Sequence, residues 1–296
     1  MFYEFSPDIL HISSPVSNDV FLIWVANKLR IPIIMTYHAD FSGFLGKIFM
    51  KFLEPIFYPL VDRIFVQSDR DQKYLVRRGI PKFKIELFYF NGVDANIFHP
   101  SNPTKSEYST PRQILFVGKI DRMHRHKGFD LLFNAFVAMR KKETNIMLKV
   151  AGGGDLESFF KESAIAMKLD GIEFLGHISL DSLVSNMQNS DILVLPSRNE
   201  GEGFGKVVLE AISCELPVVV SKYAGISSIV EKYGCGAIVD PFDTQAFVST
   251  LVSTLNDKDA WIQYKRNCKI MIDSEKLQLC NTVIHTLDTY KVFINK

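Results

Sequence analysis

Short apolar runs alternate with longer segments of helical periodicity along most of this 296-residue chain, and this alternation constrains the fold more than any other feature. Strands that alternate with helices are typical of βαβ units, which place their strands in one parallel sheet. In the first third of the chain the strand-like and helical segments are 8–12, 18–30, 32–38, 44–60, 62–68, 69–79 and 84–90. The sequence therefore predicts an α/β protein.

A polar stretch, HPSNPTKSEYSTPRQ at 99–113, interrupts the alternation and is the best candidate for a linker. A chain of this length usually exceeds one hydrophobic core, so we expect two doubly wound domains, at 1–100 and 112–275. We expect the C-terminal helix, 276–296, to pack back on the first domain. The strand-like runs of the second domain are 114–118, 146–152, 172–176, 191–197, 217–221 and 235–240.

The first expected domain is short, because it has about four strand-like runs against six in the second and opens directly on a strand. Ligands of doubly wound domains bind at the carboxyl ends of the strands, and two such domains place a ligand in the cleft between them. Functional residues are therefore expected in the loops that follow the strands.

Composition excludes several classes of function. The formal net charge is +1, so a nucleic-acid groove running over the whole surface is not expected. The four cysteines form no CxxC pair, which favours reduced cytosolic thiols over a zinc site or a disulfide scaffold. The start of the chain has no signal-peptide pattern, and no apolar run reaches about 18 residues, so we expect a cytoplasmic protein.

A glycine cluster, VAGGGDLE at 150–157, lies at an expected strand-to-helix junction. A dinucleotide fingerprint would need GxGxxG after the first strand of a domain, with an acidic residue about twenty positions later. Here the glycines are contiguous and the strand is internal. A tight turn into a helix capped by Asp155 is the favoured interpretation, and no nicotinamide cofactor is expected.

A basic loop lies within FVGKIDRMHRHKGFDLL at 116–132, between an expected strand and an expected helix. Cations beside the free amides of a helix N-terminus form a natural receptor for a diphosphate. A solvated charged loop explains the same pattern equally well. The basic or imidazole side chains are Lys119, Arg122, His124, Arg125, His126 and Lys127.

An acidic and glycine-rich loop, LVLPSRNEGEGFG, precedes a segment of helical periodicity, KVVLEAISCELP. Gly203 and Gly205 allow the backbone to approach a ligand closely. The carboxylates of Glu202 and Glu210 suit the vicinal hydroxyls of a sugar and a ribose. As a nucleophile and acid they would instead suggest hydrolysis, and the plainest alternative is that both acids favour the positive end of the helix. SKYAGISSIVE at 221–231 is a further glycine-containing loop after a strand.

Taken in order, these motifs resemble those of the group 1 (family 4) retaining glycosyltransferases, which have the GT-B architecture of two Rossmann-like domains facing a cleft. EGFGKVVLE is similar to the E-x7-E motif of the family, and FVGKIDRMHRHKG resembles its phosphate-binding loop. VAGGGDLE, FLGHI, AGISSIV and NGVDANIFHP match further family segments. The resemblance covers nearly the whole chain from PDILH onward.

The resemblance implies transfer of a sugar from a nucleotide diphosphate sugar to a glycan or lipid-linked acceptor, with retention at the anomeric carbon. Such a reaction would belong to the biosynthesis of cell-surface polysaccharide or glycolipid. Cations and helix amides would stabilise the leaving diphosphate, so neither a metal ion nor a cofactor is expected.

By motif position, the resemblance implies catalytic roles for His38, Lys127 and Glu202. Glu202 would face the donor sugar, Lys127 and Lys119 would neutralise the diphosphate, and His38 would approach the transferred sugar. A strand-end histidine satisfied by the backbone is the alternative interpretation of His38. Glu210 would hold the ribose hydroxyls. The remaining donor-binding positions are Gly118, Gly176, His177, Ile178, Gly203, Phe204 and Gly205, of which 176–178 would meet the base with their backbone.

The chain departs from the family pattern in three respects. Lysine stands at 119 where the family often has arginine, which makes a planar bidentate contact that lysine lacks. The loop to Lys127 is longer than usual, which leaves Arg122, Arg125 and His126 as candidates to share its task. Family members also begin with further βα units, so we expect a first domain that is a fragment, has a misassigned start, or is completed by an upstream polypeptide.

Two other functions remain open on the sequence alone. The chain is either a catalytically silent or incomplete partner subunit that only binds nucleotide sugar, or a GT-B nucleotide-sugar epimerase or phosphorylase. The aromatic and basic segment 44–60 is interpreted either as a core helix or as a helix lying against a membrane that holds a lipid-linked acceptor. The second interpretation would place the protein at the inner face of the membrane.

Overall fold

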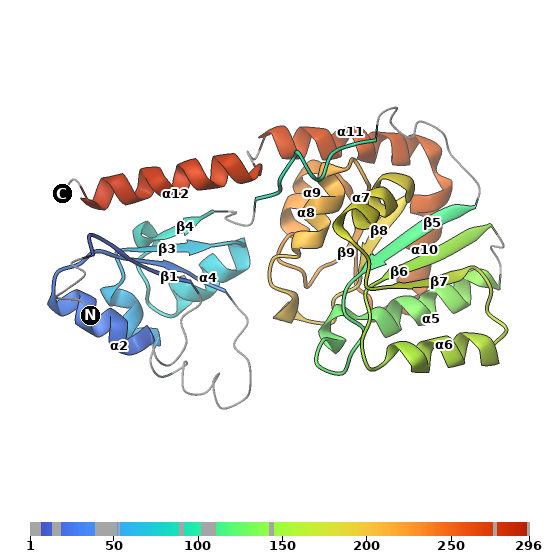
Figure 1. The fold of residues 1–296 in the computed structure, drawn as a ribbon, viewed down its shortest axis with the longest axis horizontal. Coiled ribbons are helices and arrows are strands. Elements are labelled where there is room, and N and C mark those ends of the chain that lie inside the picture. The colour runs from blue at the N-terminus through green and yellow to red at the C-terminus, as the bar shows by residue number, and fades with distance from the viewer. Residues whose placement is uncertain are drawn as a thin grey trace. The chain divides into compact units, whose positions relative to one another are not determined.

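The computed structural model describes residues 7–13, 19–38, 52, 54–88, 92–101, 111–141, 145–274 and 277–294. The chain divides into two compact units (Figure 1). The first comprises Met1–Gly92 and Leu279–Lys296, and the second comprises Val93–Gln278. Each unit is a parallel sheet with helices packed against it, which confirms the predicted α/β class.

The sheet of the first unit has four parallel strands in the order β1-β2-β3-β4. The chain therefore advances by one strand at each connection, and right-handed crossovers in one direction place their helices on one face of the sheet. The elements are β1 Leu10–Ser13, α2 Asp19–Lys28, β2 Ile33–Thr36, η1 Tyr58–Leu60, β3 Arg63–Val66, α4 Asp69–Arg77, η2 Lys82–Lys84 and β4 Ile85–Leu87.

One face of this sheet forms the core of the first unit. Ile12, Met35 and Val66 point to the same side, because side chains alternate between the two faces of a strand. They pack with Ile23 of α2 and Leu75 of α4 in one buried apolar cluster. The sequence pattern of β-branched and aliphatic residues in short runs is explained by this packing.

The C-terminal helix α12, Leu279–Ile294, covers the other face of the same sheet (Figure 1). The hydroxyl of Tyr290 lies 2.5 Å from Nδ1 of His11 on β1, and Nε2 of His285 lies 2.5 Å from Oε1 of Glu86 on β4. These contacts attach α12 to the first unit, although it follows the second unit in the sequence. Five of its apolar residues are at least half exposed: Val283, Ile284, Leu287, Val292 and Ile294.

The sheet of the second unit has six parallel strands in the order β10-β9-β8-β5-β6-β7. The chain adds strands on one side of β5 and then on the other, so the winding reverses between β5 and β8. Ligands of doubly wound sheets bind at the carboxyl ends of the strands beside such a reversal. The strands are β5 Arg112–Val117, β6 Ile146–Ala151, β7 Ile172–Gly176, β8 Ile192–Leu195, β9 Val218–Ser221 and β10 Gly236–Val239.

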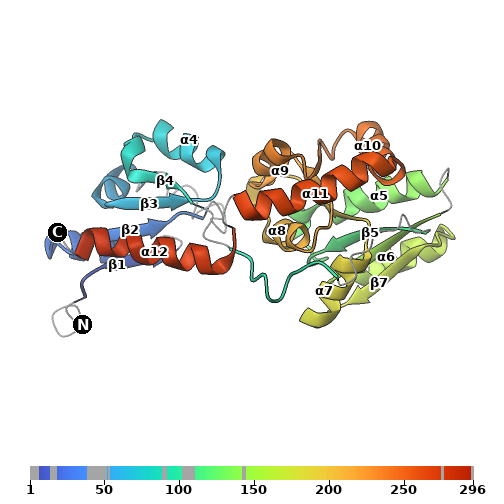
Figure 2. The same ribbon diagram turned by 90° about the horizontal axis from the view of Figure 1, so that it is seen from above.

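Helices cover both faces of the second sheet. On one face, α5 and α6 pack with α10 in the main apolar cluster, and Figure 2 shows α11 beside α8 and α9. The helices are α5 Phe129–Arg140, α6 Glu157–Ala166, α7 Leu180–Asn189, α8 Lys206–Ser213, α9 Ser227–Tyr233, α10 Thr244–Asn256 and α11 Lys258–Ser274. Two short 3-10 helices, η3 Arg125–Lys127 and η4 Glu200–Glu202, lie in loops after strands.

The amino ends of the central strands are closed by a buried ion pair. Nη1 of Arg112 lies 2.7 Å from Oδ1 of Asp191, and the two side chains are 4% and 0% exposed. Arg112 also donates to the Leu255 carbonyl, and the Trp261 indole donates to the Asp191 carbonyl. These further hydrogen bonds offset part of the cost of removing the two charges from water.

Residues 93–101 belong to the second unit, at the end where the chain enters it. The amide of Val93 donates to the Leu277 carbonyl at 2.8 Å, so the entering and leaving segments lie side by side. The hydroxyl of Ser213 on α8 donates to the Phe98 carbonyl at 2.6 Å. These contacts hold the entering segment against α8 before the polar linker begins.

Among the described residues, no helix has both the length and the apolar character that crossing a bilayer requires. Much of the segment 44–60, for which a membrane-surface helix was one interpretation, lies outside the described residues. Of its described part, Tyr58 is buried in the core of the first unit, whereas Phe52 and Ile56 are exposed.

Candidate functional site

Three loops meet at the carboxyl ends of β5, β6 and β7. The amide of Gly118 donates to the Ala151 carbonyl at 2.9 Å, and the amide of Gly152 donates to the Gly176 carbonyl at 2.8 Å. A Cβ atom at Gly152 would lie 2.1 Å from the Gly118 carbonyl oxygen, so only glycine permits this approach. The glycine cluster 152–154 therefore serves as a close-packed turn, as the sequence predicted. The predicted cap is wrong: α6 begins at Glu157 without a side-chain cap, and Asp155 instead accepts the amide of Arg122 at 3.0 Å.

The basic loop after β5 is fastened to the loop after β8. Gly128, in the left-handed region with φ of +71°, lies so close to β8 that a Cβ atom would come 1.9 Å from the Pro196 carbonyl oxygen. The amide of Arg198 donates to the His126 carbonyl at 2.7 Å, and its guanidinium pairs with Asp130 in the first turn of α5. The backbone of the basic loop is consequently held in one position.

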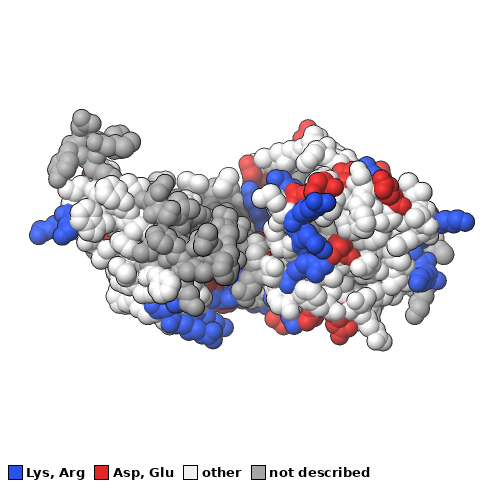
Figure 3. Space-filling model, turned by 90° about the horizontal axis from the view of Figure 1, so that it is seen from below, with Lys and Arg blue, Asp and Glu red and all other residues white. Residues whose placement is uncertain are grey.

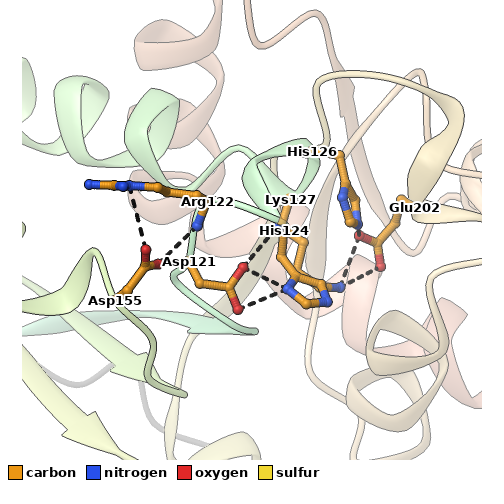
Figure 4. Close-up of polar contacts among 7 residues, drawn as sticks. All are labelled: Asp121, Arg122, His124, His126, Lys127, Asp155 and Glu202. Carbon is orange, nitrogen blue, oxygen red and sulfur yellow. Dashed lines mark hydrogen bonds and ion pairs between the residues drawn. The ribbon is translucent and has the colours of Figure 1, made fainter. Parts of the chain in front are cut away.

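Lys127 and Glu202 form the central polar contact of this end of the sheet (Figure 4). Nζ of Lys127 lies 3.0 Å from both carboxylate oxygens of Glu202, and Nε2 of His126 lies 3.9 Å from one of them. The side chains of Lys127 and Glu202 are 20% and 6% exposed. Charge pairs that are removed from water to this extent are screened less than surface pairs.

The backbone of the acidic loop is hydrogen-bonded to the loop after β9. The amide of Gly225 donates to the Gly203 carbonyl at 2.7 Å, and the amide of Ile226 donates to the Phe204 carbonyl at 2.9 Å. Phe204 is buried, and Gly205 begins α8 in the left-handed region with φ of +90°. The loop after β9 thus supports the loop that carries Glu202.

Other cations extend the positive charge around this pair. Figure 3 shows Lys and Arg side chains in a band across the second unit, with acidic side chains beside it. Lys119 and Arg125 are exposed. Arg122 faces Asp155 at 3.5 Å, with 80% of its side chain exposed, and His124 pairs with Asp121 at 2.7 Å (Figure 4). The ion pair of Arg122 lies apart from Lys127 and contributes little to stability because it is so exposed.

Glu210 lies in the second turn of α8 and is largely buried. Its side chain is 15% exposed, and the ammonium of Lys206 lies 3.9 Å from its carboxylate. Burial raises the pKa of the Glu210 carboxyl, and the positive charge of Lys206 opposes this shift. A hydroxyl donor would stabilise a carboxylate in such a position, because the hydrogen bond replaces lost hydration.

The loop after β7 contains the three positions expected to meet a base. Gly176 has φ of +64°, and no atom would lie within 4 Å of a Cβ placed there. The ring of His177 and the carboxylate of Glu157 both lie beside Gly153, 3.3 Å and 2.9 Å from where its Cβ atom would be. Ile178 follows as the chain enters α7. The structure therefore brings these positions together with the glycine turn after β6.

His38 lies in the first unit, directly after β2, and is half-buried. Burial lowers the pKa of its imidazole, and the negative charge of Asp71 opposes this shift. Within the residues that the structure describes, no group of three or more His, Cys, Asp or Glu side chains is placed to hold a metal ion. The roles of His38 and of the donor-binding residues stay predictions.

Two protein-family models match the chain. The model described as glycosyl transferases group 1 matches residues 101–270, and the model described as glycosyltransferase family 4 matches residues 1–97. The chain belongs to the group 1 glycosyltransferases. The predicted membership in family 4 and the predicted GT-B fold are both confirmed.

Individual members of the family show the same relationship. The sulfoquinovosyl transferase SQD2 of Arabidopsis thaliana is 27% identical over 275 residues, covering 86% of this chain and 51% of that protein. Sucrose-phosphate synthase of Thermosynechococcus elongatus superposes with a TM-score of 0.78 at 20% identity, over 99% of this chain and 75% of the other. HepE of Anabaena, solved with UDP and glucose, has a TM-score of 0.73 at 17% identity, over 94% and 77% of the two chains.

The chain spans 51–64% of the length of the first curated relatives that it matches. The group 1 model covers most of the second unit, and the family 4 model covers the larger part of the first. Both units of this glycosyltransferase are thus represented by recognised family segments.

Two contacts of the site were not predicted from the sequence. Lys127 and Glu202 were assigned to different parts of a ligand, whereas the structure pairs them with each other. The pair of Arg198 and Asp130 also went unnoticed. The available signal was the presence of opposite charges in two loops that a doubly wound fold places side by side.

The packing of Gly128 against β8 predicts unequal costs of two glycine substitutions. Gly176→Ala meets no atom and carries only the left-handed backbone cost of about 1–2 kcal/mol, whereas Gly128→Ala adds an overlap with the Pro196 carbonyl. We expect Gly128→Ala to lower the free energy of unfolding by about 1–3 kcal/mol more. The measurement is urea unfolding in a Trp24→Phe background, where Trp261 alone reports the second unit. Equal losses in the two variants would show that the close approach is not a constraint.

Proposed function

We propose that this chain acts as a retaining glycosyltransferase that moves a sugar from a nucleotide diphosphate sugar to a glycan or lipid-linked acceptor. The observation that carries the proposal is the placement of Lys127 and Glu202 at the reversal of strand order, beside the N-terminus of α5. Membership in the group 1 family supports it, as does the complex of the related HepE with UDP and glucose. We place the reaction in cell-surface polysaccharide or glycolipid biosynthesis, in the cytoplasm at the inner face of the membrane.

The basic loop supplies what a departing diphosphate requires. Negative charge develops on the diphosphate as the bond to the anomeric carbon breaks, and fixed cations stabilise it without reorganising. Lys127 is held at the end of η3, and the amides that open the 12-residue helix α5 follow directly. Lys119 and Arg125 add exposed positive charge to the same loop. In this proposal the reaction needs neither a metal ion nor a cofactor.

The remaining loops bind the other parts of the donor. Glu210 accepts hydrogen bonds from the ribose hydroxyls, because its carboxylate is largely buried and lacks hydration. Glu202 faces the transferred sugar, and Gly203, beside which no atom would lie within 4 Å of a Cβ, allows close approach of the backbone. The base lies against the backbone of 176–178.

Retention follows if the acceptor hydroxyl attacks from the face that the diphosphate leaves. The acceptor oxygen forms the new bond to the anomeric carbon, the bond to the phosphate oxygen breaks, and the donor phosphate takes the hydroxyl proton. No enzyme nucleophile is then required, and Glu202 acts by binding and charge. His38 of the first unit approaches the transferred sugar, and its lowered pKa keeps the imidazole neutral near pH 7.

Removing the cation or the ribose-binding carboxylate tests this assignment. We expect Lys127→Ala to abolish transfer and Glu210→Ala to weaken nucleotide-sugar binding about tenfold or more, since hydrogen bonds to charged groups contribute about 1.5–3 kcal/mol. Titration calorimetry with UDP, ADP and GDP first identifies the base, and the matching nucleotide sugars follow. Lys258→Ala, an exposed lysine of α11, is the control for loss of a charge. Wild-type binding and transfer in both site variants would refute the site.

The raised pKa of Glu210 predicts that donor binding depends on pH. The ionised carboxylate accepts the ribose hydroxyls, so protonation of the free protein weakens binding as pH falls through the raised pKa of Glu210. We expect the affinity for the nucleotide sugar, whose doubly esterified diphosphate does not titrate in this range, to fall as the pH is lowered from neutral toward the ordinary range of a glutamate carboxyl. Glu210→Gln should lose this dependence. An identical pH profile in the variant would show that another group is responsible.

A second candidate function is a subunit that binds nucleotide sugar and needs a partner for transfer. We propose that an upstream polypeptide is this partner and packs against the first unit. Among the described strands β1 lies at the edge of its sheet, and α12 carries exposed apolar residues. The test is purification of the chain with the product encoded upstream: we expect a complex, weakened at least tenfold by Ile284→Asp with Leu287→Asp and unchanged by Lys291→Ala. Sugar transfer by this chain alone would refute the need for a partner. Equal binding of the upstream product to both variants would refute its contact with α12.

A further inference from the structure

The contact between Lys127 and Glu202 has a consequence for the proposed reaction, on which this inference rests. The ammonium that must neutralise the diphosphate lies 3.0 Å from both oxygens of a carboxylate. Both side chains are mostly removed from water, at 20% and 6% exposure. Without ligand, the main cation of the basic loop is thus already satisfied.

The backbone on both sides of this contact is held by other interactions. On the lysine side, Gly128 is packed against the Pro196 carbonyl, and the His126 carbonyl accepts the amide of Arg198. On the acidic side, the carbonyls of Gly203 and Phe204 accept amides of the loop after β9. Breaking the pair therefore requires rotation of the side chains, and the long flexible chain of lysine is the one suited to rotate.

Glu202 hinders the binding of a diphosphate to this loop in two ways. It must draw Lys127 away from a carboxylate that holds the ammonium through both oxygens, and it then lies near that carboxylate as a like charge. Like charges within a few ångströms repel more strongly in a poorly hydrated site than in water. Both effects lower the affinity for the diphosphate.

We infer that Glu202 is a restraint on Lys127 that weakens the binding of the free nucleoside diphosphate and so favours its release after transfer. The donor differs from this product in carrying a sugar, whose hydroxyls satisfy the carboxylate in place of the ammonium. His126, at 3.9 Å, remains beside Glu202 when Lys127 turns to the diphosphate. Glu202 therefore discriminates between donor and product, in addition to contacting the sugar.

Three possible roles of Glu202 predict different affinities for a nucleotide that carries no sugar. If Glu202 only contacts the sugar, its charge has no effect on the affinity for the nucleoside diphosphate. If Glu202 orients Lys127 for the phosphates, removing its charge weakens that affinity. If it restrains Lys127, removing its charge strengthens the affinity.

The experiment is titration calorimetry of UDP, ADP and GDP, followed by the most tightly bound nucleotide and its sugar derivative. For Glu202→Gln, which keeps the shape of the side chain, we expect the nucleoside diphosphate to bind about threefold to tenfold more tightly and the nucleotide sugar to gain no affinity. Glu202→Asp, which keeps the charge, should bind the diphosphate as weakly as the wild type. Asp170→Asn removes an ion-paired carboxylate elsewhere in the second unit and should change neither affinity.

The outcomes separate this inference from the proposed function. Unchanged or weaker binding of the diphosphate to Glu202→Gln, beside normal binding to the wild type, would overturn the restraint and leave the proposed function standing. Absence of nucleotide binding by the wild type would overturn both. Glu202→Ala is the second variant, and thermal unfolding of each variant separates a loss of folding from a change in the site.

Discussion

The close approach of Gly128 to the carbonyl of Pro196 is the contact on which the rest of the site depends. A single added carbon would lie 1.9 Å from that oxygen, so the chain can pass from the basic loop into α5 only with glycine at this point. The approach brings the loop after β5 against the loop after β8, at the place where strand order reverses. As a result, Lys127 and Glu202, which are 75 residues apart in the sequence, become neighbours.

The two ends of the second sheet serve different purposes. At the amino ends, Arg112 and Asp191 form a buried pair whose charges are satisfied by backbone and by each other. At the carboxyl ends, Lys119 and Arg125 are exposed, and they leave positive charge in the loop beside the paired Lys127. A buried and fully partnered pair contributes to a single packed structure, whereas cations at strand ends beside a helix N-terminus are suited to bind an anion.

The sequence predicted the architecture well, because the architecture depends on local patterns. The strand-like run at 191–197 contains β8, whose four residues are all buried. The glycines of VAGGGDLE form the tight turn that their contiguity indicated. Side-chain pairs such as Lys127–Glu202 and Arg198–Asp130 were not predictable, since each joins loops whose separation is set by the packing of the whole sheet. The C-terminal helix α12 belongs to the first unit, as the sequence analysis expected.

The central claim is that the second unit binds a nucleoside diphosphate with its phosphates at the basic loop and its ribose at α8. A crystal structure of the protein with the most tightly bound of UDP, ADP and GDP tests this most directly. The account predicts phosphate oxygens within hydrogen-bond distance of Lys127 Nζ and the first amides of α5, with the ribose hydroxyls on the carboxylate of Glu210. A nucleotide bound elsewhere on the chain, or with its base rather than its phosphates against Lys127, would contradict it.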